Sequence, residues 1–198
     1  MKSLFKFVIE PKNGRYNNEK KIGDKNLLLN TELQNHQYVN RNGFVLSKPV
    51  NEETDIEVGD EVIVHHNVFR RFYDVRGTEK NSSSYFTEDK YLCALDQVFL
   101  YKRNNKWYAP EGYCFVKPIK SNDIFDNEKE KPLIGVIKYL DKSLSNKNIN
   151  YNDLVGFSPM SEYEFIIDGE RLYRVHSNSI TIKYEYQGNE EEYNPSWL

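Results

Sequence analysis

Cysteine, net charge and long apolar runs are all scarce in this 198-residue sequence, and each scarcity excludes a class of protein. Two cysteines, Cys93 and Cys114, are too few for a disulfide framework or a metal site, so both are expected in the core. A net charge of −3, spread over interspersed acidic and basic residues, gives no strong field that would attract phosphate backbones, and no nucleic-acid partner is expected. No apolar run approaches membrane-spanning length, and lysines interrupt the apolar N-terminal segment, so we expect a cytoplasmic protein with no membrane partner.

Catalytic and cofactor motifs are also missing from the sequence. It has no glycine-rich phosphate loop, no Ser-His-Asp pattern and no metal-ligand spacing. The adjacent His65 and His66 would face opposite sides of a strand, one toward the core and one toward solvent, and would not share a metal. Acidic pairs at strand entries, such as Asp60 and Glu61, are expected to mark solvent. We therefore predict no catalytic residue, no metal, no cofactor and a function that is not enzymatic.

Aromatic residues, by contrast, are abundant. The chain has 15 Tyr and 11 Phe within a modest hydrophobic fraction of 38%. These bulky side chains favour strands, and no segment keeps a helical period. The dipeptide Asp168-Gly169 between two strand-like arms predicts a hairpin with a tight turn. The fold class predicted from these features is all-β.

Four short blocks occur twice in the same order. Residues 8–11 (Val-Ile-Glu-Pro) return at 115–118, residues 43–46 (Gly-Phe-Val-Leu) at 135–138, the strand around Val62 at Val155, and residues 91–98 at 173–180. The shifts are 107, 92, 93 and 82 residues, so the loops between the blocks mostly shrink. This pattern is typical of two copies of one small β domain with different insertions.

The repeat predicts a domain at 1–103, a second at 104–187 and an acidic tail at 188–198 with a solvated glutamate run at 190–192. The first copy carries two insertions. A long polar stretch at 15–42 has no strand or helix period apart from one apolar triplet, and residues 69–90 are expected to form a hairpin with a polar tip. The residues Arg70-Arg71-Phe72-Tyr73 in this insertion suit either a solvated tip or stacking on nucleotides, and the solvated tip is favoured.

Several of these blocks resemble GroES-type co-chaperonins, the chaperonin 10 family. In the second copy the resemblance lies in residues 155–159 (Val-Gly-Phe-Ser-Pro), 168–175 (Asp-Gly-Glu-Arg-Leu-Tyr-Arg-Val) and 177–180 (Ser-Asn-Ser-Ile). In the first copy it lies in residues 58–63 (Val-Gly-Asp-Glu-Val-Ile) and 95–98 (Leu-Asp-Gln-Val). The second copy departs from the family in having Asn152-Asp153-Leu154 where the Val-Gly-Asp turn is expected, and in lacking an apolar triplet in its charged loop.

The resemblance implies two tandem GroES-like, partly open, Greek-key-type small β-barrels with long loop insertions. Tandem copies resemble the plastid co-chaperonins, and the enlarged loops resemble divergent phage-encoded ones. The implied function is that of a lid that binds a chaperonin ring and assists protein folding, as a homo-oligomeric ring. The polar stretch lies where the family has its mobile loop, so Leu27, Leu28 and Leu29 are the implied chaperonin-binding residues.

Two alternatives remain open at this point. The three leucines also suit an ordinary strand packed on the barrel. A phage virion component that uses the same barrels for ring or shell assembly would use the insertions at 15–42 and 69–90 as subunit contacts, ordered by neighbouring copies.

Overall fold

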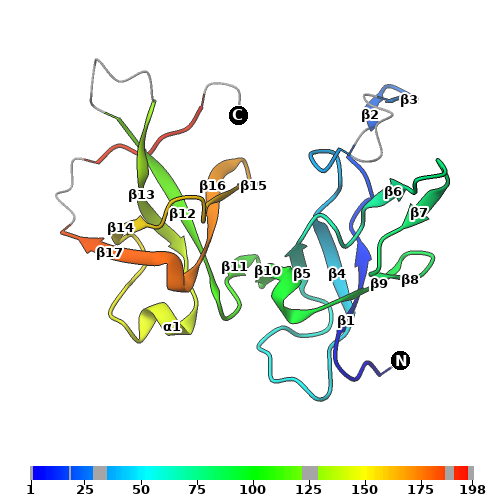
Figure 1. Cartoon of the computed structure of the whole chain (residues 1–198), viewed down its shortest axis with the longest axis horizontal. Helices are drawn as coiled ribbons and strands as arrows, with labels where there is room; N and C mark the ends of the chain where they lie inside the picture. Colours follow the sequence, from blue (N-terminus) through cyan, green and yellow to red (C-terminus); the bar gives the residue numbers. More distant parts are fainter. Residues whose placement is uncertain (1, 18, 29–34, 122–128, 186–189, 196–198) are drawn as a thin grey trace. The chain divides into compact units, whose positions relative to one another are not determined.

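The computed structural model describes residues 2–17, 19–28, 35–121, 129–185 and 190–195 (Figure 1). The chain divides into two compact units, Met1–Lys106 and Trp107–Leu198. Almost all regular structure in the described residues is antiparallel β-sheet, with one sheet of seven strands and one of six. Neither of these two sheets closes into a barrel. No helix among the described residues is long and apolar enough to cross a membrane.

The first unit is built on the seven-stranded sheet, in the order β11-β10-β5-β4-β1-β9-β8. Two further hairpins, β2-β3 and β6-β7, each form a separate two-stranded sheet. The elements in chain order are β1 (Phe7–Pro11), β2 (Glu19–Ile22), β3 (Lys25–Leu28), β4 (Asn42–Ser47), β5 (Glu61–Val64), β6 (Arg71–Tyr73), β7 (Glu79–Asn81), β8 (Tyr85–Thr87), β9 (Lys90–Cys93), the 3-10 helix η1 (Leu95–Gln97), β10 (Val98–Arg103) and β11 (Lys106–Tyr108).

The second unit is built on the six-stranded sheet, in the order β15-β16-β12-β13-β14-β17. Its hairpin β15-β16 turns at Asp168-Gly169, both with positive φ, as the sequence predicts. The elements are β12 (Tyr113–Lys120), β13 (Glu130–Tyr139), the single-turn helix α1 (Lys142–Ser145), β14 (Leu154–Phe157), β15 (Tyr163–Ile167), β16 (Glu170–His176), the 3-10 helix η2 (Ser177–Ser179) and β17 (Ile180–Tyr184).

Six strands of the two sheets follow the same order, and five of them, all except β8 and its counterpart β15, keep the same register. The order β10-β5-β4-β1-β9-β8 in the first unit matches β17-β14-β13-β12-β16-β15 in the second. Ile9 pairs with Val45 and Tyr91, and Val116 pairs with Ile137 and Tyr173. The other equivalent pairs are Val62 with Val155 and Val98 with Ile180. These structural equivalences have the same shifts as the repeated sequence blocks.

The irregularities of the sheets repeat as well. A register shift between Val8 and Ile9 in β1 recurs between Phe115 and Val116 in β12. Each unit also places a 3-10 helix directly before its last equivalent strand, η1 before β10 and η2 before β17. Bulges bend a strand and increase its twist, so the two units share local distortions as well as strand order.

Glycine is required at one equivalent position of both sheets. A Cβ added to Gly43 would lie 2.6 Å from the carbonyl oxygen of Glu10, and one added to Gly135 would lie 2.4 Å from that of Lys117. Real side chains do not tolerate such approaches, so the repeated Gly reflects backbone contact between paired strands. This explains why Gly43 and Gly135 stand out in the sequence repeat.

The turn before β5 and its counterpart before β14 have the same geometry despite different sequences. Gly59 has φ +92° and Asn152 has φ +66°, in the left-handed region that Gly and Asn tolerate best. Gly59 donates its N–H to the carbonyl of Val45, and Asn152 donates to that of Ile137. The apparent departure from the Val-Gly-Asp pattern in the second copy therefore preserves the turn.

Two sequence expectations about strands are wrong. The sequence pattern at 91–101 predicts one continuous strand, but the structure ends β9 at Cys93, inserts η1 and begins β10 at Val98. The polar stretch at 15–42 contains the hairpin β2-β3, although it lacks apolar alternation. Cys93 and Cys114 are both fully buried, as expected.

The acidic segment after β17 is not a free tail. Ile119 of β12 forms an antiparallel bridge with Glu192, and the Tyr193 N–H donates to the carbonyl of Pro118. Glu191 pairs with Lys120 at 3.1 Å, and Glu192 pairs with Lys138 at 2.6 Å. The glutamate run thus pairs with lysines of the second unit, while the side chains of Glu191 and Glu192 remain exposed to solvent, as expected.

Candidate functional site: an exposed apolar hairpin

The candidate site is the hairpin β2-β3, which lies on the connection between the paired strands β1 and β4 (Figure 1). Its two-residue turn places Gly23 at φ +60°, a conformation that Gly adopts without strain. The side chains of Ile22, Leu27 and Leu28 are 58%, 52% and 51% exposed. Three large aliphatic side chains on one small hairpin form an unusual solvent-exposed surface.

The register of the hairpin decides which of these side chains face the same way. Ile22 pairs with Lys25, and Leu27 pairs with Lys20, two positions further along. Residues two apart on a strand share a face, so Ile22 and Leu27 lie on one face and Leu28 on the other. Leu27 and Leu28 lie in β3, and the third predicted residue, Leu29, lies outside the described residues.

Ile22 is a candidate binding residue that the sequence reading missed. The reading looked for a contiguous triplet, whereas a hairpin brings together residues that are five positions apart in the sequence. The signal was present in the turn Gly23-Asp24, which places Ile22 opposite Lys25. The alternative of a strand packed on the core is also wrong, because about half of each described leucine side chain is exposed.

A fixed stem carries the hairpin. Tyr16 and Val39 form an antiparallel bridge, and the backbone of Asn40 donates to the carbonyl of Arg15 at 2.9 Å. The Asn40 side chain is buried and donates to the carbonyls of Lys12 and Gly14. A buried amide with satisfied donors fixes the two chains that enter and leave the hairpin.

The stem is also tied to the second insertion of this unit. The Arg15 guanidinium donates to the carbonyl of Phe69 at 3.0 Å and to Asn81 Oδ1 at 2.8 Å. It also lies 5.3 Å from the centroid of the Tyr91 ring, which is within cation-π range. The two insertions of the first unit are therefore joined by hydrogen bonds at the base of the hairpin.

The residues Arg70 to Tyr73 are engaged in this support. Arg71 pairs with Glu79 at 2.8 Å across the hairpin β6-β7, and its guanidinium lies 5.1 Å from the centroid of the Tyr16 ring. The Tyr16 hydroxyl accepts the N–H of Arg71 at 2.7 Å. The hairpin tip is solvated as expected, with Val75 fully exposed. The arrangement gives Arg71 a structural role at the stem.

Three of the four histidines gather beside the stem, contrary to expectation. His65 and His66 follow the end of β5 at Val64, so they do not alternate as strand residues do, and their rings stack with centroids 4.2 Å apart. His36 approaches His66 with ring centroids 5.2 Å apart. Burial, followed by the nearby His65 and Arg41, lowers the pKa of His66 to about 4.

This histidine cluster gives no metal site. Among the residues the structure describes, no three His, Cys, Asp or Glu side chains form a group that could hold a metal ion. With a pKa of about 4, His66 is neutral at physiological pH, which allows the rings to pack closely. The cluster joins the segment that leaves the hairpin to the turn after β5.

Comparison with known proteins gives no further identification. No protein-family model matches the chain, and no curated protein matches it in sequence. The hairpin and its stem are therefore interpreted from their own geometry and from the exposed apolar side chains of the hairpin.

Proposed function

We propose that this chain is a co-chaperonin-like lid protein that binds a chaperonin ring through the hairpin β2-β3 and assists protein folding in the cytoplasm. The observation that carries the proposal is the exposure of Ile22, Leu27 and Leu28 on a hairpin held by a fixed stem. This hairpin occupies the connection between β1 and β4, where the resemblance to GroES-type proteins implies the mobile loop. The finer assignment of each sheet as a partly open, GroES-like barrel belongs to the same proposal.

Because the apolar surface of the hairpin β2-β3 is small, a single hairpin is expected to bind weakly. Complete burial of a large aliphatic side chain contributes about 1.5–3 kcal/mol. Since about half of each of the three side chains is already covered, docking adds roughly 1 kcal/mol from each. A formed hairpin reduces the ordering cost of about 1–2 kcal/mol per residue that a flexible loop would incur. A single arm therefore binds and releases readily.

Tight binding to a chaperonin ring then requires several hairpins that bind together. In a ring of identical copies, the second and later hairpins bind intramolecularly, and avidity adds roughly 10²–10⁴ in affinity without new contacts. We therefore place the chain in a homo-oligomeric ring. One hairpin alone binds weakly enough to be released, whereas several hairpins of a ring together bind tightly enough to cap the chaperonin.

Co-sedimentation with a purified chaperonin and ATP tests the proposal. The double variant Leu27→Ser/Leu28→Ser should lower the bound fraction at least tenfold, and Ile22→Ser should weaken binding on its own. The matched control is Val50→Ser/Val58→Ser, which removes two loop side chains of similar exposure, 62% and 59%, from the same unit. Because all these side chains are largely exposed, circular dichroism should show an unchanged fold.

Two results would overturn this function. Equal binding by the hairpin variant and the wild-type chain would show that the hairpin is not the anchor. Recovery of the protein in purified phage particles, with no chaperonin binding by the wild-type chain, would favour the structural alternative.

A further inference from the structure

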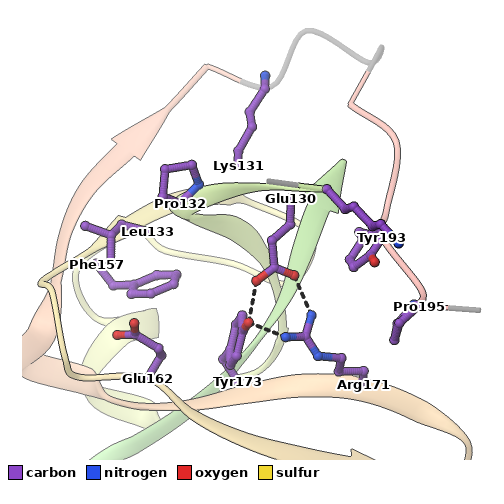
Figure 2. Close-up of a pocket in the computed structure, with 11 residues that line it drawn as sticks. Glu130, Lys131, Pro132, Leu133, Phe157, Glu162, Arg171, Tyr173, Tyr193 and Pro195 are labelled. Atoms are coloured by element: carbon purple, nitrogen blue, oxygen red, sulfur yellow. Dashed lines mark hydrogen bonds and ion pairs between the residues drawn. The ribbon is translucent and has the colours of Figure 1, made fainter. Parts of the chain in front are cut away.

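The second unit contains a surface pocket of about 450 Å³, whose walls come from the start of β13, the end of β14, the loop before β15, the strand β16 and the segment at 190–195 (Figure 2). Its central polar groups bind one another: Arg171 donates to Glu130 and Glu164, and the Tyr173 hydroxyl donates to Glu130. The Arg171 guanidinium also lies 4.8 Å from the centroid of the Tyr173 ring. Because these groups satisfy one another, they stabilise the second unit, and the surface that offers groups to a partner lies in the first unit.

That surface lies at the end of the first unit opposite to the hairpin β2-β3 (Figure 1). It consists of Leu4 and Phe5, which precede β1, and Val50, which follows β4, and their side chains are 57%, 61% and 62% exposed. Since β1 and β4 are antiparallel partners, the residues before β1 and after β4 share one end of the pair, and the hairpin lies at the other end. We call these three residues the N-terminal apolar surface. Contiguous exposed apolar side chains mark a site of interaction.

Backbone hydrogen bonds hold the N-terminal apolar surface together. The N–H of Val50 donates to the carbonyl of Ser3, and the N–H of Asn51 donates to that of Leu4, both at 3.0 Å. The segment before β1 and the loop after β4 are therefore fastened side by side in parallel. A surface that is already assembled loses less conformational entropy when a partner binds it.

Exposed charges of opposite sign lie at the two ends of this surface. Lys2 precedes Ser3, and Lys6 lies beside Ser3, whose hydroxyl donates to the Lys6 carbonyl. Glu52 and Glu53 follow the other end of the paired segments. All four charged side chains are exposed, and within the described part of the chain none of them forms an ion pair. The surface thus has an apolar centre, a basic end and an acidic end.

From this arrangement we infer that the N-terminal apolar surface binds the same surface of a second copy of this chain. A two-fold axis through the apolar centre brings the lysines of each copy to the glutamates of the other, so the surface is complementary to itself. The contact buries apolar side chains at its centre and pairs charges at its rim. It uses no residue of the hairpin β2-β3, so the inference does not depend on the proposed chaperonin function.

The small size of the surface sets the strength of this contact. A stable interface takes roughly 20–30 residues from each partner, and this surface offers far fewer. The dimer should therefore be weak and should form only as the protein concentration rises. Because its rim is charged and exposed, added salt should weaken it.

Analytical ultracentrifugation of the full chain from about 10 µM to about 1 mM, a range that suits a weak complex, tests the inference. The mass should double as the concentration rises, from one chain to two, or from one ring to two if the chain forms the ring proposed above. Leu4→Ser/Phe5→Ser should raise the dissociation constant roughly tenfold or more. The control Leu27→Ser/Leu28→Ser removes two side chains of similar exposure, 52% and 51%, from the opposite end and should associate like the wild type.

Charge reversal tests the two-fold arrangement itself. Lys2→Glu/Lys6→Glu and Glu52→Lys/Glu53→Lys should each associate roughly tenfold more weakly than the wild type, because like charges then face each other in the dimer. An equimolar mixture of these two variants should associate like the wild type, since opposite charges again meet at both ends. Circular dichroism should show an unchanged fold for every variant, because all the altered side chains are exposed.

Three results would overturn the inference: a mass that does not change with concentration, unchanged association of Leu4→Ser/Phe5→Ser, or no recovery in the mixture of charge variants. The variants of this surface all keep the hairpin β2-β3, so they should co-sediment with a chaperonin as the wild type does. Val50→Ser/Val58→Ser, the control for chaperonin binding, also keeps the hairpin and should weaken only the association between copies. Failure of this inference is therefore distinguishable from failure of the proposed function.

Discussion

Asp60 and Asp153 occupy equivalent positions in the two units, and each makes one hydrogen bond to the backbone and one ion pair. Each carboxylate accepts the backbone N–H of the residue three positions earlier, at 2.8 Å for Asp60 and 2.7 Å for Asp153. Each also pairs with a cation, Arg103 at 2.5 Å and Lys183 at 2.6 Å. The expectation that the acid at this strand entry only marks solvent is wrong for Asp60, whose side chain is 6% exposed.

This equivalence predicts unequal costs for the same substitution. Asp60→Ala should lower the free energy of unfolding by about 2–3 kcal/mol, because it removes a buried carboxylate that accepts both the backbone N–H of Glu57 and the guanidinium of Arg103. Asp153→Ala should cost about 1 kcal/mol, because its side chain is 21% exposed and water replaces part of the lost contact. Urea unfolding followed by circular dichroism measures both. A larger loss at Asp153 would contradict this explanation.

The paired glycines give a second prediction. Gly43→Ala and Gly135→Ala should each destabilise their unit by about 1–3 kcal/mol, because the new methyl group would collide with a backbone carbonyl. Gly156→Ala is the control, since its added Cβ meets its nearest atom, in the Tyr184 ring, at 3.2 Å. The first unit has Ile63 at the position equivalent to Gly156. Thermal unfolding should therefore show a smaller effect for Gly156→Ala.

A third prediction concerns pH and the histidine cluster. Burial lowers the pKa of His66 from 6.5 to about 4, with His65 and Arg41 adding to the shift and His36 and Arg70 contributing less. The unfolded chain therefore binds more protons than the folded chain between these two values. The stability that His66 contributes is fully present above pH 6.5 and is lost as the pH falls toward 4.

Allowing for screening by solvent at a partly exposed ring, this loss should be on the order of 1 kcal/mol. It is measured as the difference between wild type and His66→Gln in urea unfolding at pH 7 and at pH 4.5. Comparing the two proteins removes the pH dependence that they share, including that of His176 in the second unit, whose pKa is also lowered by burial. An unchanged difference between the two pH values would refute the assignment to His66.

The buried Lys117 gives a fourth prediction. Its side chain is 1% exposed, its Nζ donates to Asn194 Oδ1, and Glu170 lies 3.9 Å away. Burial lowers the pKa of Lys117, while Glu170 and Glu192 act in the opposite direction. Asn194→Ala should lower the free energy of unfolding by about 1–3 kcal/mol, because a buried ammonium group loses its acceptor.

Two variants sharpen this experiment. Asn178→Ala makes the same truncation at an exposed position of the second unit and should change the stability by less than about 0.5 kcal/mol. Adding Lys117→Met to Asn194→Ala should restore most of the loss, because a methionine of similar length needs no acceptor. Additive effects of the two substitutions would rule out the proposed coupling.

The sheet registers follow closely from the sequence repeat. The shifts of 107, 92, 93 and 82 residues reappear as structural equivalences because each block contains residues with few substitutes. Gly43 and Gly135 are fixed by contact with a carbonyl, and Tyr91 and Tyr173 pair directly with the central strands β1 and β12. A position that geometry constrains this tightly remains visible in the sequence after its neighbours have changed.

Other features of the structure have no recognisable pattern in the sequence. The hairpin β2-β3 is built largely from Lys, Asn and Glu, so its strands lack the apolar alternation that marks a buried face. The segment from Tyr91 to Tyr101 resembles one strand in the sequence because β9 and β10 both contain buried apolar side chains and only the three-residue helix η1 and Ala94 separate them. The pocket gathers residues from distant parts of the chain, and no local pattern encodes such a gathering.

The pairing of Ile119 with Glu192 also sets an order of events during synthesis. The strands of the seven-stranded sheet have all been made by the time translation reaches Tyr108, so the first unit can fold while the remainder is still being translated. In the second unit, Lys117 is covered by a segment that is synthesised about 75 residues later. Its burial is therefore completed only after that segment has been made. The hairpin β2-β3 of the first unit is therefore complete well before the second unit has matured.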